Sequence, residues 1–133
     1  MTWIPKEKEI DALLSADGKR RYQYFIHRVC DTRKMWGLFS DGWASLGDGE
    51  KKLIPFWPHQ IYAERFKSTD WSSYVPREID LEVLLERWIP GMSAEGVGPA
   101  IFPNASGSAV IVSLADLEAN LRHELSESYG EEG

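Results

Sequence analysis

Apolar residues recur at helical spacing in several segments of this chain, so the pattern predicts α-helices there. Weaker stripes fall within residues 5–15, 58–67 and 114–125. The two strongest stripes have apolar side chains at i, i+3, i+4, i+7 and i+8: Tyr22, Phe25, Ile26, Val29 and Cys30 in the first, and Leu81, Leu84, Leu85, Trp88 and Ile89 in the second. Each of these two helices is expected to pack against the core along its stripe.

Residues that begin or end helices flank these stripes. Ser15 and Asp80 can each cap the helix that follows, because a side-chain oxygen accepts a hydrogen bond from a free backbone N–H in the first turn. Ser113 with Asp116 resembles a capping box for the last helix. The pair Pro90-Gly91 is expected to end the helix that begins after Asp80.

Between residues 36 and 57 the pattern changes from helical to extended, with two Asp-Gly pairs between apolar segments. The pair Asp41-Gly42 predicts a tight two-residue turn, because both residues tolerate a positive φ. The second pair, at residues 48–49, predicts another reversal. Three strands should therefore form an antiparallel meander, in which Pro55 lies at an open edge because it has no N–H to donate.

Together these elements predict an α+β fold with a five-stranded, largely antiparallel sheet, made of the meander and a hairpin of residues 97–102 and 108–112, packed with four or five helices. Residues 1–133 are expected to form a single domain. Within it, residues 1–14 should form a helical lid and residues 126–133 a frayed acidic tail.

The charge is negative overall and unevenly distributed. The chain has 21 acidic and 15 basic residues, for a net charge of −6, and residues 68–133 alone carry 12 acidic and 3 basic residues, a charge of −9. This balance argues against nucleic acid as a partner, because phosphate backbones require clustered cations. No apolar run is long enough for a membrane span, and the N-terminal sequence lacks a signal-peptide pattern, so we expect a cytoplasmic protein without a membrane partner.

Few residues indicate chemistry. No His or Cys pair has metal-ligand spacing, no glycine-rich phosphate loop is present, and no catalytic set stands out, so we expect no cofactor and no metal. Cys30 lies on an apolar stripe, which favours a packed, inert thiol. His59 follows an aromatic strand at the start of a helix, where it could either bind an anion or simply cap the helix.

Aromatic strands and acidic helix residues suggest a surface for a partner. A two-residue turn at Asp41-Gly42 would place Trp36, Leu38 and Trp43 on one face of the meander. If helices covered only the other face, this one would form a tryptophan-rich patch; if both were covered, the tryptophans would be core. Glu82 and Glu86 are like charges one helical turn apart, which a partner could relieve, although a solvated helix face would carry the same residues.

Several motifs in the same order resemble a known family. They lie within about residues 15–125 and comprise Tyr22-Gln23-Tyr24-Phe25-Ile26, Trp36-Gly37-Leu38, Asp41-Gly42-Trp43-Ala44, Phe56-Trp57-Pro58-His59, Tyr62-Ala63, Trp88-Ile89-Pro90-Gly91 and Ala100-Ile101-Phe102-Pro103. This set resembles the bacterial domain of unknown function numbered 2750. The resemblance implies a small, soluble bacterial α+β protein and assigns no catalytic residue. Gly18 departs from the family pattern, which favours an acidic residue at this position.

Two functions are compatible with these features. The first is a non-catalytic protein-binding module, such as an immunity or antitoxin-like protein that occludes a toxin through an acidic and aromatic surface. Its hypothetical contact residues are Trp36, Trp43, Trp57, His59, Glu82 and Glu86. The second is a small enzyme or ligand-binding protein with a pocket near Trp57 and His59. The missing catalytic signature favours the first.

Overall fold

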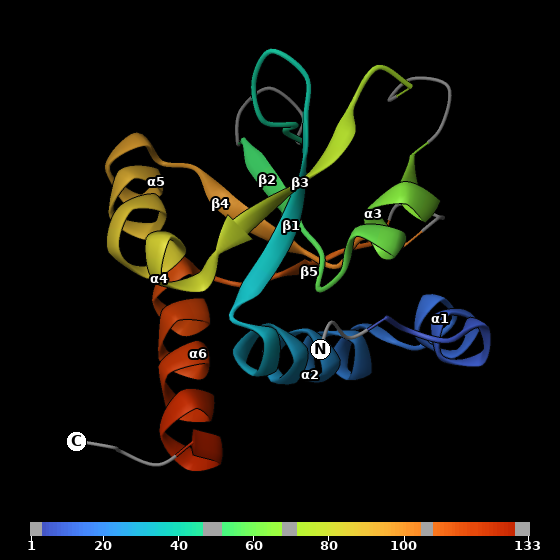
Figure 1. The fold of residues 1–133 in the computed structure, drawn as a ribbon. Helices are drawn as coiled ribbons and strands as arrows, with labels where there is room; N and C mark the ends of the chain where they lie inside the picture. The colour runs from blue at the N-terminus through green and yellow to red at the C-terminus, as the bar shows by residue number, and fades with distance from the viewer. Residues whose placement is uncertain (1–3, 47–51, 68–71, 105–107, 130–133) are drawn as a thin grey trace.

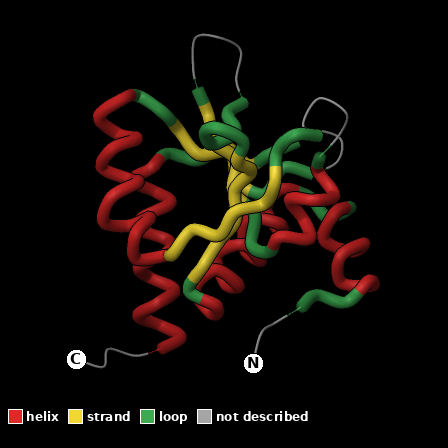
Figure 2. The backbone as a smooth tube through the Cα atoms, turned by 45° about the horizontal axis from the view of Figure 1, so that its top comes forward, coloured by secondary structure: helices red, strands yellow, loops and turns green. Residues whose placement is uncertain are grey.

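In the part of the chain that the computed structural model describes, residues 4–46, 52–67, 72–104 and 108–129, the backbone forms five helices and two β-sheets (Figure 1). The strands lie centrally, with α6 and the helix before β4 on one side and α1 and α3 on the other (Figures 1 and 2). The elements in chain order are α1 (Glu7–Leu14), α2 (Gly18–Thr32), β1 (Lys34–Phe39), β2 (Leu53–Phe56), α3 (Gln60–Phe66), β3 (Val75–Asp80), α4 (Leu81–Val83), the π-helix η2 (Leu84–Trp88), α5 (Ile89–Glu95), β4 (Gly98–Ile101), β5 (Val110–Ile111) and α6 (Leu114–Tyr129). The contiguous elements α4, η2 and α5 form one continuous helix.

The α+β class is confirmed, but the predicted five-stranded sheet is wrong. One sheet pairs β1 with β3 in antiparallel orientation, and the other has the order β2-β4-β5. Strand β2, expected as the third strand of the meander, is instead parallel to β4. Its sequence, Leu53 to Phe56, is apolar without alternation, which is typical of a strand covered on both faces in a parallel pair. The predicted hairpin is found as the antiparallel pair β4 and β5.

The turn after β1 differs from the predicted one by one residue. Phe39 pairs with Trp43, and Asp41 adopts a left-handed φ of 64° between them. Because side chains alternate along a strand, this register places Trp43 on the face of Phe39 and not on that of Trp36 and Leu38. Beyond this turn, Trp43 and Leu46 make only isolated bridges. The second Asp-Gly pair, at residues 48–49, lies outside the described residues.

Strand β3 was not among the strands that the sequence predicted. In β3 only Ile79 is buried, and Pro76 interrupts the segment, so the period-two signal of a half-buried strand is weak. Its six residues pair with all six residues of β1. Nonlocal pairing therefore decides the structure of this segment.

The helix that begins after Asp80 does not end at Pro90-Gly91 but continues to Glu95. A proline inside an α-helix normally loses one hydrogen bond and clashes with a carbonyl in the preceding turn. Here the π-helical turn Leu84–Trp88 directly precedes Pro90, and the N–H of Ile89 bonds to the carbonyl of Leu84, five residues earlier. We infer that this wider turn accommodates the proline. Asp80 makes no side-chain capping bond.

Helix caps were predicted correctly at one end of the chain and not at the other. Ser113 Oγ accepts the N–H of Asp116 at 3.0 Å, as expected for the last helix. That helix continues through Ser126 to Tyr129, where a frayed tail was predicted. The cap of α2 is Asp17, whose carboxylate accepts the N–H of Arg20, and not Ser15.

The buried apolar residues form one cluster, to which α1 contributes Ile10 and Leu13. The predicted stripes supply its centre: Phe25, Val29, Cys30, Leu81 and Leu84 are fully buried. Helix α1 therefore packs on the core through Ile10 and Leu13.

Arg21 is a buried cation that ties distant segments together. Its side chain is only 2% exposed, and it donates three hydrogen bonds to backbone carbonyls. The acceptors are Ala16 at 2.8 Å, Phe102 at 3.0 Å and Ser108 at 3.1 Å. Burial lowers the pKa of Arg21. The guanidinium thus fastens the start of α2 to the segment that connects β4 and β5.

The packing of the π-helical turn predicts a large effect for Leu85→Ala. Leu85 is 7% exposed, so its truncation leaves a cavity in the core and should lower the free energy of unfolding by about 2–5 kcal/mol. Urea unfolding followed by circular dichroism measures this difference. Arg87→Ala, at an exposed position of the same turn, is the control and should change stability by less than about 0.5 kcal/mol. Equal stability of the two variants would contradict the burial of Leu85.

The Arg21 contacts predict that charge alone cannot replace the guanidinium. Arg21→Lys keeps the positive charge but cannot reach three divergent carbonyls, so it should lower the free energy of unfolding by about 1–3 kcal/mol. Arg20→Lys, one residue away and exposed, should leave it within about 0.5 kcal/mol of wild type. Chemical denaturation of both variants measures the two free energies of unfolding. An unchanged denaturation midpoint for Arg21→Lys would refute the role of the three guanidinium hydrogen bonds.

Candidate functional site

An open hollow of about 370 Å³ lies between the β1-β3 sheet and the helix that follows it. Two half-buried indole rings, Trp43 and Trp88, meet in it with centroids 5.0 Å apart and planes at 72°. Trp88 also contacts the fully buried Phe56, at 5.7 Å, which anchors it to the core. The hollow is lined by Trp43, Arg77, Glu78, Ile79, Asp80, Val83 and Trp88.

The position of Trp43 depends on the strand beneath it. Its ring packs on Phe39 at 5.1 Å, and the Arg77 guanidinium lies 4.3 Å from the Phe39 centroid and 5.8 Å from that of Trp43. A Cβ atom at Gly37 would come within 3.0 Å of the Trp43 ring. Glycine at this position therefore allows the indole to approach the strand closely, and the Arg77 guanidinium packs against the rings of Phe39 and Trp43.

Acidic residues surround the hollow, but basic residues balance several of them. Glu78 pairs with Lys34 at 3.5 Å, and Glu82 approaches Arg33 at 3.9 Å. Glu86 is exposed on the same helix, and among the described residues it makes no ion pair. The rim is thus polar and mixed in charge, and the predicted repulsion between Glu82 and Glu86 is partly relieved within the chain itself.

The other predicted contact residues lie elsewhere. Trp57 is fully buried, and its Nε1–H donates to the carbonyl of Pro103 at 2.9 Å. His59 is 8% exposed, and its Nδ1 accepts the N–H of Ile61 at 3.1 Å, so it caps α3. Trp36 is half-buried, with its ring centroid 6.4 Å from that of His59. These three residues serve packing and capping. Of the other predicted contact residues, Trp43 lines the hollow, and Glu82 and Glu86 belong to the helix that also contributes Val83 and Trp88 to it.

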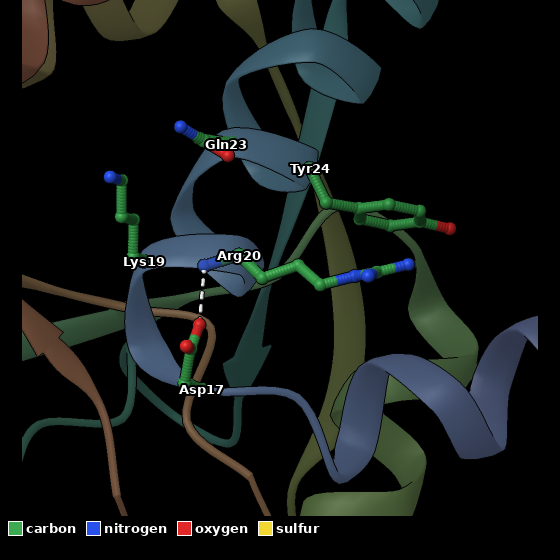
Figure 3. A pocket seen from close by; sticks show the side chains of 5 residues that line it. All are labelled: Asp17, Lys19, Arg20, Gln23 and Tyr24. Carbon is green, nitrogen blue, oxygen red and sulfur yellow. Dashed lines mark hydrogen bonds between the residues drawn. The ribbon is translucent and has the colours of Figure 1, made fainter.

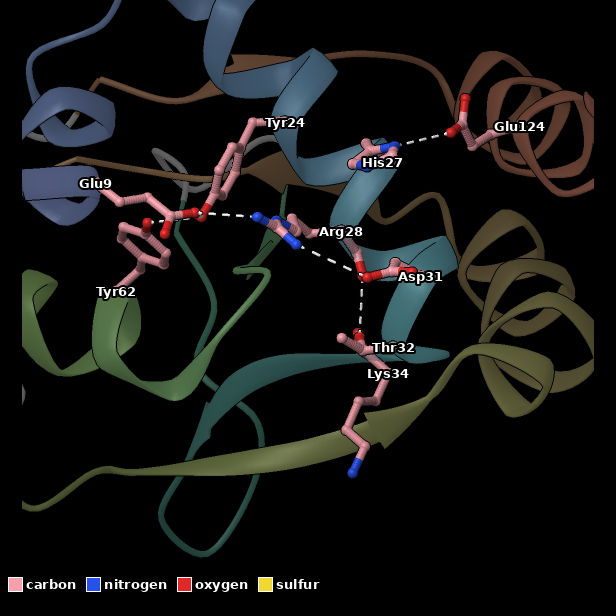
Figure 4. A network of polar contacts seen from close by, with 9 residues as sticks. All are labelled: Glu9, Tyr24, His27, Arg28, Asp31, Thr32, Lys34, Tyr62 and Glu124. Atoms are coloured by element: carbon pink, nitrogen blue, oxygen red, sulfur yellow. Dashed lines mark hydrogen bonds and ion pairs between the residues drawn. The ribbon is translucent and has the colours of Figure 1, made fainter. Parts of the chain in front are cut away.

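A polar cluster joins α1 to α2 and α3 (Figure 4). The Tyr24 hydroxyl bonds to Glu9 at 2.5 Å and to the Tyr62 hydroxyl at 2.9 Å, and Arg28 lies 3.4 Å from the same Glu9 oxygen. Burial raises the pKa of Tyr24, and it raises that of Tyr62 to about 12. The cluster is satisfied within the chain, which indicates that it holds the N-terminal helix in place.

A second depression, of about 500 Å³, lies beside the start of α2 and is lined by Asp17, Lys19, Arg20, Gln23 and Tyr24 (Figure 3). Lys19 and Gln23 point to one side of the helix, whereas Arg20 and Tyr24 point to the other. The Asp17 carboxylate is occupied in capping α2. Because these polar groups do not converge, the depression is a weaker candidate than the hollow.

The single cysteine of the chain, Cys30, is its candidate reactive thiol. Cys30 is buried, its thiol contacts the carbonyl of Leu121, and burial raises its pKa to about 12, which agrees with an inert thiol. In the described ranges, no three His, Cys, Asp or Glu side chains gather as metal ligands would. None of the helices described has the length and apolar character needed to cross a bilayer.

The sequence did not identify Arg77, Val83 or Trp88 as surface residues. Trp88 belongs to a predicted core stripe, but in the structure it is half-exposed and its ring packs against that of Trp43. In residues 77–80 the side chains alternate between two types, with Arg77 and Ile79 separated by acidic residues. This short alternation is the feature of the sequence that could have predicted the strand lining the hollow.

The tyrosine cluster predicts a loss of stability at alkaline pH. The pKa of Tyr62 is raised from 10.0 to about 12, so the unfolded chain ionises first, and the stabilisation present below pH 10 is lost as pH rises towards 12. Urea unfolding between these pH values should show a steeper decline for wild type than for Tyr62→Phe, which lacks the titrating hydroxyl. If the free energy of unfolding declined equally for wild type and Tyr62→Phe, the result would contradict the raised pKa of Tyr62.

Comparison with known proteins agrees with the family suggested by the sequence motifs. Among curated proteins, none matches this chain. The family match covers residues 22–121 of the 133-residue chain and so includes Trp43, Arg77, Val83 and Trp88. The chain therefore belongs to the family described as protein of unknown function (DUF2750).

Proposed function

We propose that this protein is a non-catalytic protein-binding module whose contact surface is centred on the hollow between Trp43 and Trp88. The observation that carries the proposal is an aromatic pair, anchored in the core but half-exposed, beside the exposed apolar side chain of Val83. Energetic centres of protein interfaces are typically aromatic, supported from below and surrounded by polar residues that exclude water. The charged residues Arg77, Glu78 and Asp80, which line the hollow together with the rings, fit that description.

Charge supports the choice of partner at longer range. The net charge of −6 would attract a basic protein and speed the encounter. Near the hollow itself, Lys34 and Arg33 offset Glu78 and Glu82, so aromatic contact contributes more than net charge to the bound state. An immunity or antitoxin-like role, in which the protein occludes a basic toxin in the cytoplasm, is the most specific form of this proposal.

A ligand pocket near Trp57 and His59 has less support. Both side chains are buried, and each makes a hydrogen bond within the chain. A ligand would have to displace the cap of α3 or the bond to Pro103. We therefore leave Trp57, His59 and Trp36 out of the proposed contact surface.

The proposal predicts that a charge in the hollow weakens binding and that an equivalent charge elsewhere does not. Val83 is 39% exposed beside the two tryptophans, and Ile111 is 57% exposed on β5, in the other sheet. We expect Val83→Glu to retain its fold and to lose affinity about tenfold or more, because a carboxylate would be desolvated against the rings. Ile111→Glu is the matched control.

Affinity capture with quantitative mass spectrometry, using wild type and both variants as bait in extract of the source organism, provides the measurement. Support consists of a protein captured by wild type and Ile111→Glu and depleted with Val83→Glu. Equal capture by all three baits, or no capture above a blank matrix, would show that the hollow is not a protein-binding surface. Circular dichroism of the two variants confirms that both are folded.

A further inference from the structure

Strand β3 has only one neighbour in its sheet. It pairs with β1, and no other strand of the described residues pairs with Val75–Asp80. The opposite side of β3 is therefore a sheet edge, which carries backbone donors and acceptors available to another strand.

The bonds of β1 determine which β3 groups face that edge. Trp36 exchanges both backbone bonds with Trp57, at 2.8 Å each, on the side away from β3. Trp36 is opposite Glu78, so this pair does not exchange hydrogen bonds. The N–H and C=O of Glu78 consequently point outward, and by alternation so does the N–H of Asp80, whereas Arg77 and Ile79 bond to β1.

Pro76 occupies the third outward position. Its missing N–H costs the β1-β3 ladder nothing, because the ladder does not use this position. The edge also disfavours a second copy of this chain: antiparallel pairing about Glu78 would bring two Glu78 carboxylates together and place Pro76 opposite Asp80. A partner segment with basic residues would instead place positive charges opposite Glu78 and Asp80, which is favourable.

The hollow adjoins this edge on one face. Ile79 and Arg77 line it together with Trp43, and their side chains lie on the same face of β3. In an added strand, the residue opposite Ile79 would point to that face, and the residues opposite Glu78 and Asp80 would point to the other. A single extended segment could thus use both the edge and the hollow.

We propose that the partner contributes an extended segment that adds to β3 as an antiparallel strand. An apolar side chain opposite Ile79 enters the hollow, and basic side chains lie opposite Glu78 and Asp80. This inference rests on the proposed function, for which it names the mode of recognition: backbone hydrogen bonds to Glu78 fix the register, and the hollow selects the apolar residue.

A peptide of alternating lysine and leucine is the probe. When it binds, amide exchange followed by NMR should slow at Glu78 and Asp80 by about tenfold or more, because their N–H groups gain acceptors or are shielded. Exchange at Arg77 and Ile79 should stay unchanged, because these amides already bond to β1. This alternation distinguishes strand addition from general stabilisation.

Four controls sharpen the experiment. The same peptide with backbone N-methylation opposite Glu78 should not bind, and a glutamate-leucine peptide should bind at least about tenfold more weakly. Glu78→Lys should reverse the preference between the two charged peptides. Glu95→Lys, an exposed charge reversal in α5, should leave it unchanged.

Absence of lysine-leucine peptide binding would overturn the inference, as would binding that shifts the Trp43 and Trp88 signals without slowing exchange at Glu78. Both results leave the protein-binding proposal to the capture experiment, in which depletion with Val83→Glu is measured independently of any peptide. Slow exchange at Glu78 in the free protein would also overturn the inference, because the edge would then be closed.

Discussion

The two backbone hydrogen bonds between Trp36 and Trp57 are the constraint on which the arrangement of the strands depends. They connect the middle of β1 to the residue after β2, and so they join two sheets that otherwise share no ladder. Because this side of β1 is occupied by Trp57 and by the turn that carries Trp43, only its other side remains for β3. The bridge therefore confines β3 to the other side of β1, and no strand of the described residues pairs with the outer edge of β3.

The same constraint positions the aromatic residues. Trp57 lies in the core, where its indole N–H bonds to the carbonyl of Pro103, and it is therefore not part of the surface. The turn after β1 places Trp43 opposite Phe39, with its ring next to Gly37. The π-helical turn then brings Trp88 against it. Trp43 and Trp88, from segments distant in sequence, thus meet beside Val83 in the hollow.

Stability and recognition use different parts of the molecule. Arg21 and the cluster of Glu9, Tyr24 and Tyr62 fasten the N-terminal helices to the core through bonds that are complete within the chain. The hollow, by contrast, combines half-buried rings with exposed charges. This separation allows changes at Val83 or Glu78 to alter binding while the buried contacts remain intact, which makes the proposed surface experimentally accessible.

The sequence by itself determined which segments form helices, though not where each begins and ends. It also determined the Ser113 cap, the β4-β5 hairpin and the burial of Phe25, Val29 and Leu84, because helical periodicity and capping depend on residues within a few positions of one another. It also named Trp43 and Glu82, but not Arg77 or Val83, since a surface hollow requires two segments to meet. Only the tertiary structure decided that β2 pairs with β4, that 75–80 is a strand, and that Arg33 offsets Glu82. Strand partners and ion pairs are contacts between residues far apart in the chain, and the one-residue difference at Asp41 shows how a small local change moves Trp43 to the other face of β1.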